Sequence, residues 1–323
     1  MKRNRIGQTD VKVTALSLGG ASLGNLGSVI SDDDARAVMQ HAWTAGIRYF
    51  DTAPRYGRGL SEQRIGAFLK DRSRSDYVLS TKVGRVLSPG PALKEADGFI
   101  DPLPNAVHYD YSAAGIRESL AQSGARLGTD RIEIVYVHDI GNYTHGPVDG
   151  ARHMEDLLGS GMGALQDLKQ AGRIGAIGLG VNESQVCLDV MRHCPLDGIL
   201  LAGRLTLLDR EAEAGLLDAC RAQGTSLVLG GIFNSGILAT GPQPGAWFDY
   251  APASQDILDR VGDLQQRARA VGLTLAEAAV QFALHQPQTS SVLLGTGKVS
   301  YLQRNLDAAA LTLTDAARDF VTT

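Results

Sequence analysis

Eight short apolar segments that alternate with helix-like segments predict an α/β protein of the (β/α)8 class, a TIM barrel with long loops at the C-terminal face. The apolar segments are continuous rather than alternating, as is typical of parallel strands that helices cover. The chain has 323 residues, which is enough for eight such units. No low-complexity linker divides it, so we expect one barrel domain over 1–323.

The strands can be placed in order along the chain. Residues 11–14 alternate apolar and polar side chains, which is typical of a small surface hairpin, and a buried strand follows that ends in Gly19 and Gly20. Ser31 and the three aspartates after it predict a capped helix that stops at Gly46. The predicted barrel strands are 15–20, 49–51, 77–82, 132–139, 175–181, 198–202, 226–230 and 291–295.

A helix is expected after each strand, and Ser61 is expected to cap the second helix. The predicted helices are 31–46, 61–70, 112–127, 162–170, 183–193, 208–223, 255–270, 275–285 and 300–310. Three segments are predicted as long irregular loops: 85–110, 140–160 and 234–254. An open doubly wound sheet is the alternative, but residues 19–24 lack the glycine spacing of a dinucleotide-binding fingerprint.

Composition excludes several classes of partner. The 31 basic and 35 acidic residues give a net charge of -4 without a basic stripe, so nucleic acid is not an expected partner. No stretch approaches the roughly 20 apolar residues that span a bilayer, and no apolar leader follows the charged N-terminus. Cys187, Cys194 and Cys220 lack paired spacing, which is typical of free thiols in a reducing cytoplasm. The oligomeric state is left open.

Four polar residues follow neighbouring strands. Asp51 ends the second strand and Tyr56 lies on the loop beyond it, while Lys82 and His138 end the third and fourth strands. A lone lysine at a strand end is often structural, and a lone histidine is often a core residue. Because consecutive strand tips are neighbours in a barrel, all four side chains are expected to meet at one mouth.

This combination fits proton transfer at an alcohol or carbonyl oxygen. An ammonium group near a phenol stabilises the phenolate and lowers its pKa from about 10. Lys82 is expected to act in this way on Tyr56, and Asp51 is expected to hold Lys82. His138 could donate a hydrogen bond to the substrate oxygen. Because no side chain accepts a hydride, redox chemistry here implies a nicotinamide.

These residues and their surroundings resemble the aldo-keto reductase family over essentially the whole chain. The resemblance implies that Asp51, Tyr56, Lys82 and His138 are a catalytic tetrad. The matching segments are 5–10, 18–20, 50–53, 56–57, 61–62, 80–82, 137–138 and 295–305.

The resemblance also implies contacts with the cofactor, although several of the residues are glycines that a turn alone could require. Those contacts are Gly20, Asn182, Gly230, Gly231, Phe233, Asn234, Ser235, Gly236, Gly295, Gly297, Lys298 and Asn305. Leu205 stands where many relatives have an aromatic residue that stacks on the nicotinamide. Gly297 stands where NADP-preferring relatives often have arginine, and Lys298 follows it. NAD is therefore favoured, with NADP possible.

Four segments resemble the branch of the family that contains aldose 1-dehydrogenases and pyridoxal 4-dehydrogenase, namely 110–112, 138–146, 202–209 and 249–252. The implied reaction is oxidation of the C1 hemiacetal of a small-molecule sugar, such as L-fucose or another D-threo-type aldose, to its lactone. Pyridoxal forms the same functional group, and a general NADPH-dependent aldehyde reductase is a further alternative. Candidate substrate contacts on the loops are His108, Tyr109, His145, Trp247 and Tyr250.

Other chemistries are weaker hypotheses. No metal site is expected, because His145 with His138 and Asp139 matches no compact ligand spacing. A barrel lyase that uses Lys82 as a Schiff-base nucleophile would allow borohydride trapping and would need no nicotinamide. A protein that only senses nicotinamide would give no reduced cofactor in an absorbance assay.

Overall fold

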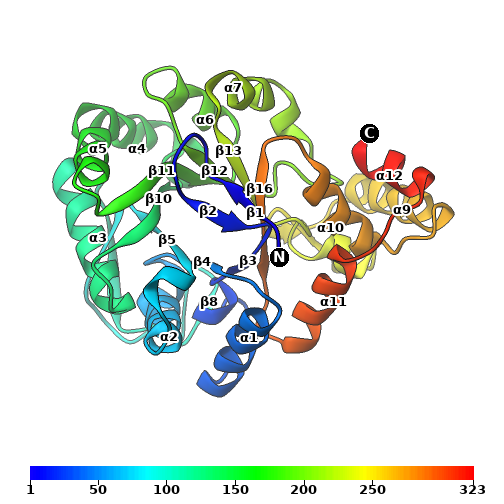
Figure 1. The fold of residues 1–323 in the computed structure, drawn as a ribbon, viewed down its shortest axis with the longest axis horizontal. Helices are drawn as coiled ribbons and strands as arrows, with labels where there is room; N and C mark the ends of the chain where they lie inside the picture. The colour runs from blue at the N-terminus through cyan, green and yellow to red at the C-terminus, as the bar shows by residue number, and fades with distance from the viewer.

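The computed structural model describes residues 1–323, and eight parallel strands close into a barrel that helices surround (Figure 1). This confirms the predicted fold class. The last barrel strand pairs with the first, and the third pairs with the fourth, so the sheet has no open edge. The barrel strands are β3 (Leu16–Gly19), β4 (Tyr49–Asp51), β5 (Val78–Val83), β10 (Ile132–His138), β11 (Ile174–Val181), β12 (Gly198–Ala202), β13 (Ser226–Gly230) and β16 (Thr289–Gly295).

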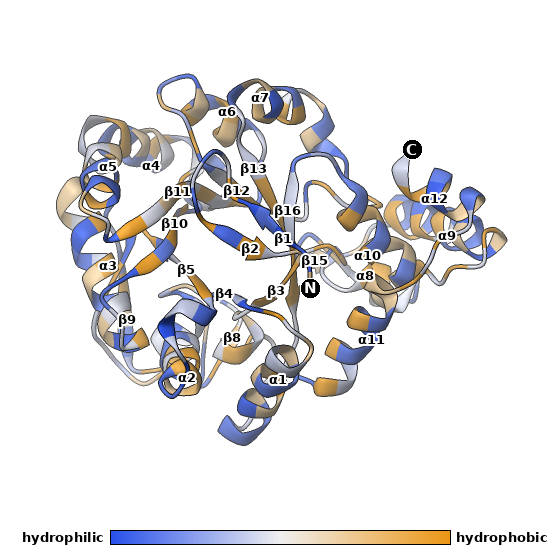
Figure 2. Cartoon of the chain, in the orientation of Figure 1, coloured by the Kyte–Doolittle hydropathy of each residue, from blue (hydrophilic) through white to orange (hydrophobic).

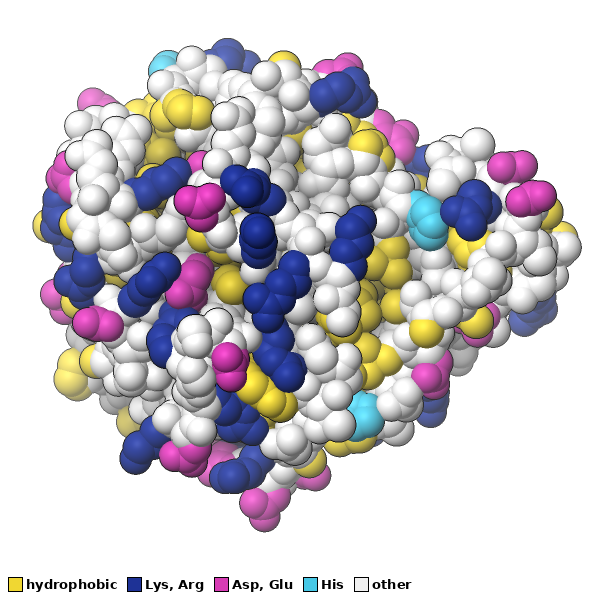
Figure 3. All heavy atoms as spheres, viewed as in Figure 1, with side chains coloured by type: hydrophobic (Ala, Val, Ile, Leu, Met, Phe, Trp, Pro, Cys, Tyr) yellow, Lys and Arg dark blue, Asp and Glu magenta, His cyan; other side chains and the backbone are white.

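An antiparallel hairpin of β1 (Arg3–Arg5) and β2 (Lys12–Thr14) crosses the N-terminal end of the barrel (Figure 1). Apolar side chains beside and within it, among them Ile6 and Val13, pack onto residues inside the barrel. Lys and Arg side chains gather near the middle of this face (Figure 3). The hairpin therefore covers one end of the barrel, and a site has to be built at the other.

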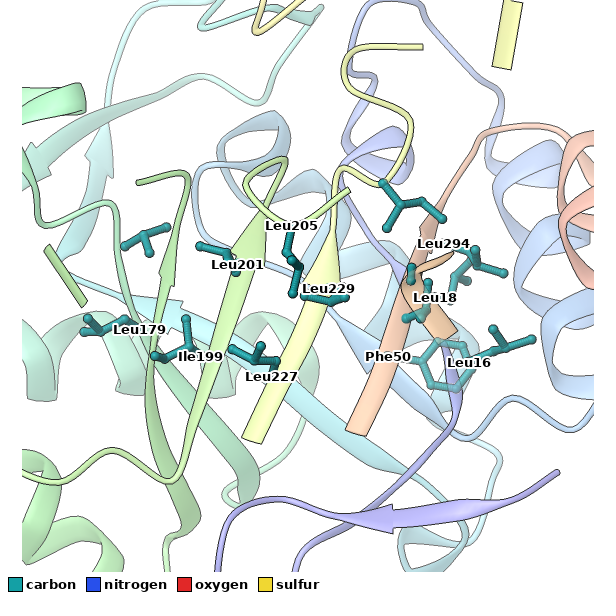
Figure 4. Close-up of a cluster of buried hydrophobic side chains, with 14 of the residues drawn as sticks. Leu16, Leu18, Phe50, Leu179, Ile199, Leu201, Leu205, Leu227, Leu229 and Leu294 are labelled. Carbon is teal, nitrogen blue, oxygen red and sulfur yellow. The ribbon is translucent and has the colours of Figure 1, made fainter. Parts of the chain in front are cut away.

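Helices cover the outside of the barrel, and apolar side chains fill the layer between helices and strands (Figures 2 and 4). The helices are α1 (Asp32–Thr44), α2 (Leu60–Leu69), α3 (Ala113–Leu127), α4 (Asn142–Asp156), α5 (Met162–Gln170), α6 (Gln185–Met191), α7 (Leu216–Gln223), α8 (Ile237–Thr240), α9 (Gln255–Ala270), α10 (Leu275–His285), α11 (Val299–Ala309) and α12 (Asp315–Thr322). None of them combines the length and the apolar character that crossing a bilayer requires.

Side-chain caps begin several of the helices. A serine or threonine hydroxyl accepts a backbone N–H in the first turn of five of them, as predicted for Ser31 at α1. Thr274 and Glu277 form a reciprocal capping box at α10. By contrast, α11 begins after Lys298 without a side-chain cap, so its first N–H groups have no such partner.

The three predicted loops contain regular structure, so their description as irregular was wrong. Segment 140–160 contains all of α4, in which Gly146 has a left-handed φ of 68° before Pro147; the Gly-Pro pair concealed the helix from the sequence pattern. Segment 85–110 contains β6 (Arg85–Pro89) and β9 (Asn105–Tyr109), which pair antiparallel, and the short strands β7 (Glu95–Ala96) and β8 (Phe99–Ile100). Segment 234–254 contains α8 and the two-residue strands β14 (Trp247–Phe248) and β15 (Ala251–Pro252).

Two helix starts also differ from the prediction. The helix predicted over 208–223 begins only at Leu216, because Gly215 has a φ of 107° and interrupts the turn before it. Ser61 does not cap α2: Gly59 is its N-cap residue, and Ser61 lies buried within the helix, where its hydroxyl accepts a hydrogen bond from Thr52. The apolar spacing of α2 was correct, and only the boundary moved.

Candidate active site

Adjacent strands β4, β5 and β10 bring the four predicted catalytic side chains together at their C-terminal tips. The Lys82 ammonium donates hydrogen bonds to Asp51 Oδ2 at 2.7 Å and to the Thr52 carbonyl oxygen at 2.9 Å. Its Nζ lies 4.7 Å from the centroid of the Tyr56 ring, and that ring meets the His138 imidazole edge-on at 6.0 Å. A buried ion pair thus lies beneath a phenol and an imidazole.

A chain of hydroxyl groups inside the barrel supports Asp51. Ser80 Oγ donates to Asp51 Oδ1 at 2.6 Å, so it must accept from the Tyr49 hydroxyl, which lies 3.0 Å away. The Tyr49 oxygen then accepts from the Tyr136 hydroxyl at 3.1 Å. Each proton in this chain points toward the buried carboxylate, which stabilises its negative charge.

The electrostatics of the pair correct one expectation. Burial acts to lower the pKa of Lys82, but Asp51 and Tyr56 raise it above 10.5, so the ammonium stays charged. Burial raises the pKa of Tyr56 above 10.0, and the positive charge of Lys82 opposes this shift without reversing it. Lys82 thus acts on the Tyr56 pKa in the expected direction, but desolvation outweighs the neighbouring ammonium and the net shift is upward.

His138 is held neutral. Burial lowers its pKa well below 6.5, and the positive charges of Arg85, Lys82 and Arg55 lower it further. Arg85 Nη1 lies 3.2 Å from His138 Nδ1, while Asp139 Oδ2 lies 3.4 Å from His138 Nε2. A neutral imidazole can donate one hydrogen bond to a substrate oxygen without carrying charge.

Arg85 and Asp139 were not predicted as site residues, although the structure places both beside His138. Arg85 Nη2 donates to Asp139 Oδ2 at 2.7 Å, and both side chains are buried. Asp139 also has a left-handed φ of 46°. The available signal was positional: Arg85 follows Lys82 by three residues and Asp139 follows His138 directly, so each lies just beyond a strand that carries a predicted catalytic residue.

Comparison with known proteins places this architecture in a family. A model of the Aldo/keto reductase family matches residues 15–319. The chain belongs to the aldo/keto reductase family. As a member of it, the reductase is an oxidoreductase that uses a nicotinamide cofactor and acts on a small molecule.

Several relatives are similar over nearly their whole length. D-threo-aldose 1-dehydrogenase of Pseudomonas sp is 39% identical over 93% of this chain and 90% of its own. Pyridoxal 4-dehydrogenase of Microbacterium luteolum is also 39% identical, over 94% of this chain and 92% of its own. The solved holo form of aldo-keto reductase AKR11C1 from Bacillus halodurans is 27% identical and superposes with a TM-score of 0.79, covering 99% of this chain and 95% of its own.

The residues expected to hold the cofactor lie at or beyond the tips of β3, β11, β13 and β16 and in α11. A Cβ added at Gly295 or Gly236 would meet nothing within 4 Å, so the backbone there is open to a ligand. Gly231, Asn234, Ser235 and Gly236 all have left-handed φ angles, between 45° and 99°. Such a turn lets the backbone approach a ligand closely, which fits a dinucleotide.

The start of α11 fits an anionic group. Its first turn has no side-chain cap, Lys298 stands at the N-cap position, and the Lys298 Nζ lies 5.2 Å from the Tyr301 ring centroid. Uncapped N–H groups and the positive end of a helix attract phosphate. Gly297 packs closely against Ile30, because an added Cβ would lie 3.0 Å from Ile30 Cγ2.

Two of the expected cofactor residues take part in packing or hydrogen bonding within the protein itself. An added Cβ at Gly20 would lie 2.5 Å from Ser61 Oγ, so glycine is required there for close packing. The Asn234 side chain accepts from Thr206 Oγ1 at 2.5 Å and donates to the Gly203 carbonyl oxygen at 3.1 Å. Both polar atoms of its side-chain amide therefore already have a partner within the protein.

Leu205 does not offer an exposed face for stacking. It is 1% exposed and packs beside Leu201 and Leu229 in the apolar layer (Figure 4). Whatever contacts the nicotinamide ring on that side is not this leucine, because its side chain points into the protein. The main chain at Gly203, with a φ of 75°, lies nearer the surface.

An ion pair fastens the 241–253 segment to the barrel. Arg204, which follows β12, donates from Nη2 to both carboxylate oxygens of Asp249 at 2.9 Å. Its Nε donates to the Asn182 carbonyl oxygen at 2.8 Å. Asp249 and Tyr250 have left-handed φ angles of 49° and 62°, so the ion pair holds a strained turn in place.

The five expected substrate contacts do not form one group. Tyr250 is 61% exposed and lies near the mouth, where partial desolvation and the charges of Tyr56 and Asp139 raise its pKa. Tyr109 and His145 pack edge-on at 4.7 Å beside the Arg85 guanidinium. His108 instead bonds Ser88 across the β6–β9 hairpin at 2.8 Å, and Trp247 lies exposed on β14. Neither of these two makes a ring contact or hydrogen bond with the tetrad.

Proposed function

We propose that the reductase oxidises the C1 hemiacetal of a small aldose, such as L-fucose or another D-threo-type sugar, to its lactone. The single observation that carries the proposal is the buried Lys82–Asp51 pair lying directly beneath Tyr56 and beside a neutral His138. The similarity to D-threo-aldose 1-dehydrogenase supports the sugar as substrate.

The side chains divide the reaction among them. The Tyr56 phenolate takes the proton of the C1 hydroxyl, and His138 Nε2–H donates a hydrogen bond to the same oxygen. Lys82 favours the phenolate by its charge, and Asp51 holds Lys82 at 2.7 Å. A nicotinamide bound at the mouth supplies the acceptor for the C1 hydride. Since burial raises the pKa of Tyr56, the phenolate forms most readily under alkaline conditions, which favours oxidation over reduction there.

We infer that NAD is the preferred cofactor. Lys298 stands at the uncapped start of α11, and a lysine gives a single charge rather than the two-pronged contact that arginine makes with a 2′-phosphate. The one arginine of α11, Arg304, has its guanidinium 5.3 Å from the Tyr301 ring centroid. We propose that the rest of the dinucleotide is held by Asn182, Phe233, Asn305 and the glycines at the strand tips.

A substrate panel tests both assignments. L-fucose, D-arabinose, L-galactose, D-galactose and pyridoxal are each incubated with NAD and with NADP, and the absorbance of the reduced cofactor is followed. We expect turnover of at least one sugar with NAD. If no hemiacetal is oxidised while simple aldehydes are reduced with NADPH, the chain is a general aldehyde reductase and the proposal is wrong.

Pyridoxal oxidation is the second candidate, because the pyridoxal 4-dehydrogenase is as similar to this chain as the aldose enzyme is. Both substrates present a cyclic hemiacetal to Tyr56. A sugar carries further hydroxyl groups, which could donate hydrogen bonds to Asp139. Pyridoxal instead presents an aromatic face, which Tyr109 or Tyr250 could contact. Higher kcat/KM for pyridoxal than for every sugar would favour this candidate.

A further inference from the structure

Arg85 is the largest fully buried side chain of the molecule, and it lies at the catalytic mouth. It begins β6, and its backbone oxygen accepts a hydrogen bond from Ser119 on α3 at 2.9 Å. Its guanidinium faces two neighbours, Asp139 Oδ2 at 2.7 Å and His138 Nδ1 at 3.2 Å. Burying a guanidinium is costly unless its N–H groups find partners, and His138 supplies a partner in addition to the Asp139 carboxylate.

The contact with His138 determines which ring nitrogen carries the proton. A guanidinium has five N–H donors, no acceptor and no accessible neutral form. His138 Nδ1 must therefore be the acceptor, and the proton of the neutral ring must be on Nε2. The Asp139 carboxylate lies 3.4 Å from Nε2 but accepts no hydrogen bond from it, so Nε2–H stays available to a substrate oxygen.

We propose that Arg85 is a positioning residue that holds His138 as the neutral Nε2–H tautomer, so that Nε2–H can donate to the C1 oxygen of the substrate. This role rests on the proposed function, because the donated hydrogen bond matters only if His138 faces the reacting oxygen. Arg85 itself touches neither substrate nor cofactor in this role, and it acts through the imidazole.

The charges around His138 keep the tautomer in place. Three cations face the ring from three elements: Arg85 on β6, Lys82 on β5 and Arg55 after β4. One carboxylate, Asp139 after β10, and the edge of the Tyr56 phenol complete the surroundings. An imidazolium would direct an Nδ1–H toward the guanidinium, so the cationic form is disfavoured as well as the other neutral tautomer.

Replacing Arg85 by methionine removes the donor while keeping a long apolar side chain. In Arg85→Met, Nδ1 is free to carry the proton, one cation is lost and Asp139 keeps only Arg55 as an arginine partner, at 3.9 Å. We expect His138 to populate the Nδ1–H and cationic forms near neutral pH. Catalytic turnover of the sugar, kcat, should fall about 10- to 100-fold, whereas the dissociation constant of the cofactor should not change.

The decisive measurement does not use activity. Two-bond ¹H–¹⁵N correlation spectra of the ¹⁵N-histidine-labelled protein distinguish the two neutral tautomers, and His138→Gln identifies the signals of His138. The wild type should show Nε2–H without titrating between about pH 6 and about pH 9, whereas Arg85→Met should show a mixture that titrates in this range. Nδ1–H in the wild type, or an unchanged pattern in Arg85→Met, would overturn the proposal.

Matched variants separate positioning from stability. Arg74→Met removes another partly buried arginine ion pair, with Glu133 at 2.6 Å, before β5 begins, so it should destabilise the protein without altering the His138 signals. Arg85→Lys keeps a donor-only side chain and should restore Nε2–H in part. If Arg85→Met does not fold, Arg85→Met with Asp139→Asn removes the Asp139 charge and carries the same prediction.

Activity measurements then distinguish a failure of the proposed function from a failure of the positioning role. If the wild type shows Nε2–H but oxidises no sugar or pyridoxal, the proposed function fails and the tautomer assignment stands. If Arg85→Met changes the tautomer and keeps full kcat, the positioning role is wrong and the proposed function stands.

Discussion

The main chain of Gly180 on β11 lies against the aliphatic stem of Lys82, so that an added Cβ would be 3.2 Å from Lys82 Cε and 3.3 Å from Cδ. Lys82 cannot yield, because its ammonium is bonded to Asp51 and Thr52. We predict that Gly180→Ala displaces the ammonium and lowers kcat about tenfold, which corresponds to about 1.4 kcal/mol of barrier. Gly163→Ala on α5, whose Cβ would meet nothing within 4 Å, should keep full activity in the same kinetic assay.

Removing Lys82 should cost stability as well as activity. Lys82→Met leaves the fully buried Asp51 without its partner, and the free energy of unfolding should fall by about 3 to 5 kcal/mol in urea titrations. Lys82→Met combined with Asp51→Asn should recover part of this loss while remaining inactive. Equal losses in the single and double variants would mean that the pair adds little to stability.

The rate of oxidation should rise with pH. Because burial keeps the pKa of Tyr56 above 10.0, the phenolate fraction grows about tenfold per pH unit below that value, and kcat/KM for sugar oxidation should follow it. Tyr56→Phe should abolish turnover while cofactor binding, measured by fluorescence titration, is largely kept. A plateau of kcat/KM below about pH 8 would argue against the phenol as the proton acceptor.

The burial of several tyrosines also predicts that the folded protein loses stability at alkaline pH. Burial raises the pKa of Tyr49, Tyr56, Tyr111 and Tyr136 above the 10.0 of an exposed tyrosine. A raised folded-state pKa gives stability that is complete below about pH 10 and is lost as the pH rises further. Ultraviolet titration should therefore show these tyrosines ionising only as the protein unfolds, and Tyr49→Phe should not remove this late transition.

The ion pair over the mouth should control release of the cofactor. Asp249→Asn weakens the contact with Arg204 that holds two left-handed residues, and we predict an approximately tenfold faster dissociation of the reduced cofactor in stopped-flow fluorescence. Proteolysis within 241–253 should also become faster. Asp189→Asn, which breaks an exposed i,i+3 pair with Arg192 on α6, is the matched control and should change neither rate.

The barrel itself was predictable because its strands are short, continuous apolar runs that alternate with helix-like segments. The distorted helix α4 was not, since Gly146 and Pro147 are residues that usually mark a loop. The β6–β9 hairpin was also missed, because its register is set by pairing between residues 85–89 and 105–109 rather than by a tight turn.

The tetrad residues could be placed because each follows a strand whose neighbours are known once the barrel is assumed. Arg85 and Arg204 could not, because a buried arginine is recognisable only from the carboxylates around it, and Asp139 and Asp249 come from distant parts of the chain. The direction of the Tyr56 pKa shift was wrong for a similar reason. It depends on how deeply the phenol is buried, which strand-tip position does not reveal.

The hydrogen-bonded chain from Tyr136 through Tyr49 and Ser80 to Asp51 sets the exit route for the proton that oxidation releases. Every hydroxyl in it already gives its single hydrogen to the next oxygen toward Asp51, and the chain ends at a buried phenol. With their hydrogens in this arrangement, the hydroxyls cannot carry a proton from the Tyr56 side further into the barrel. We therefore expect that proton to return to bulk water through the opening by which the sugar enters.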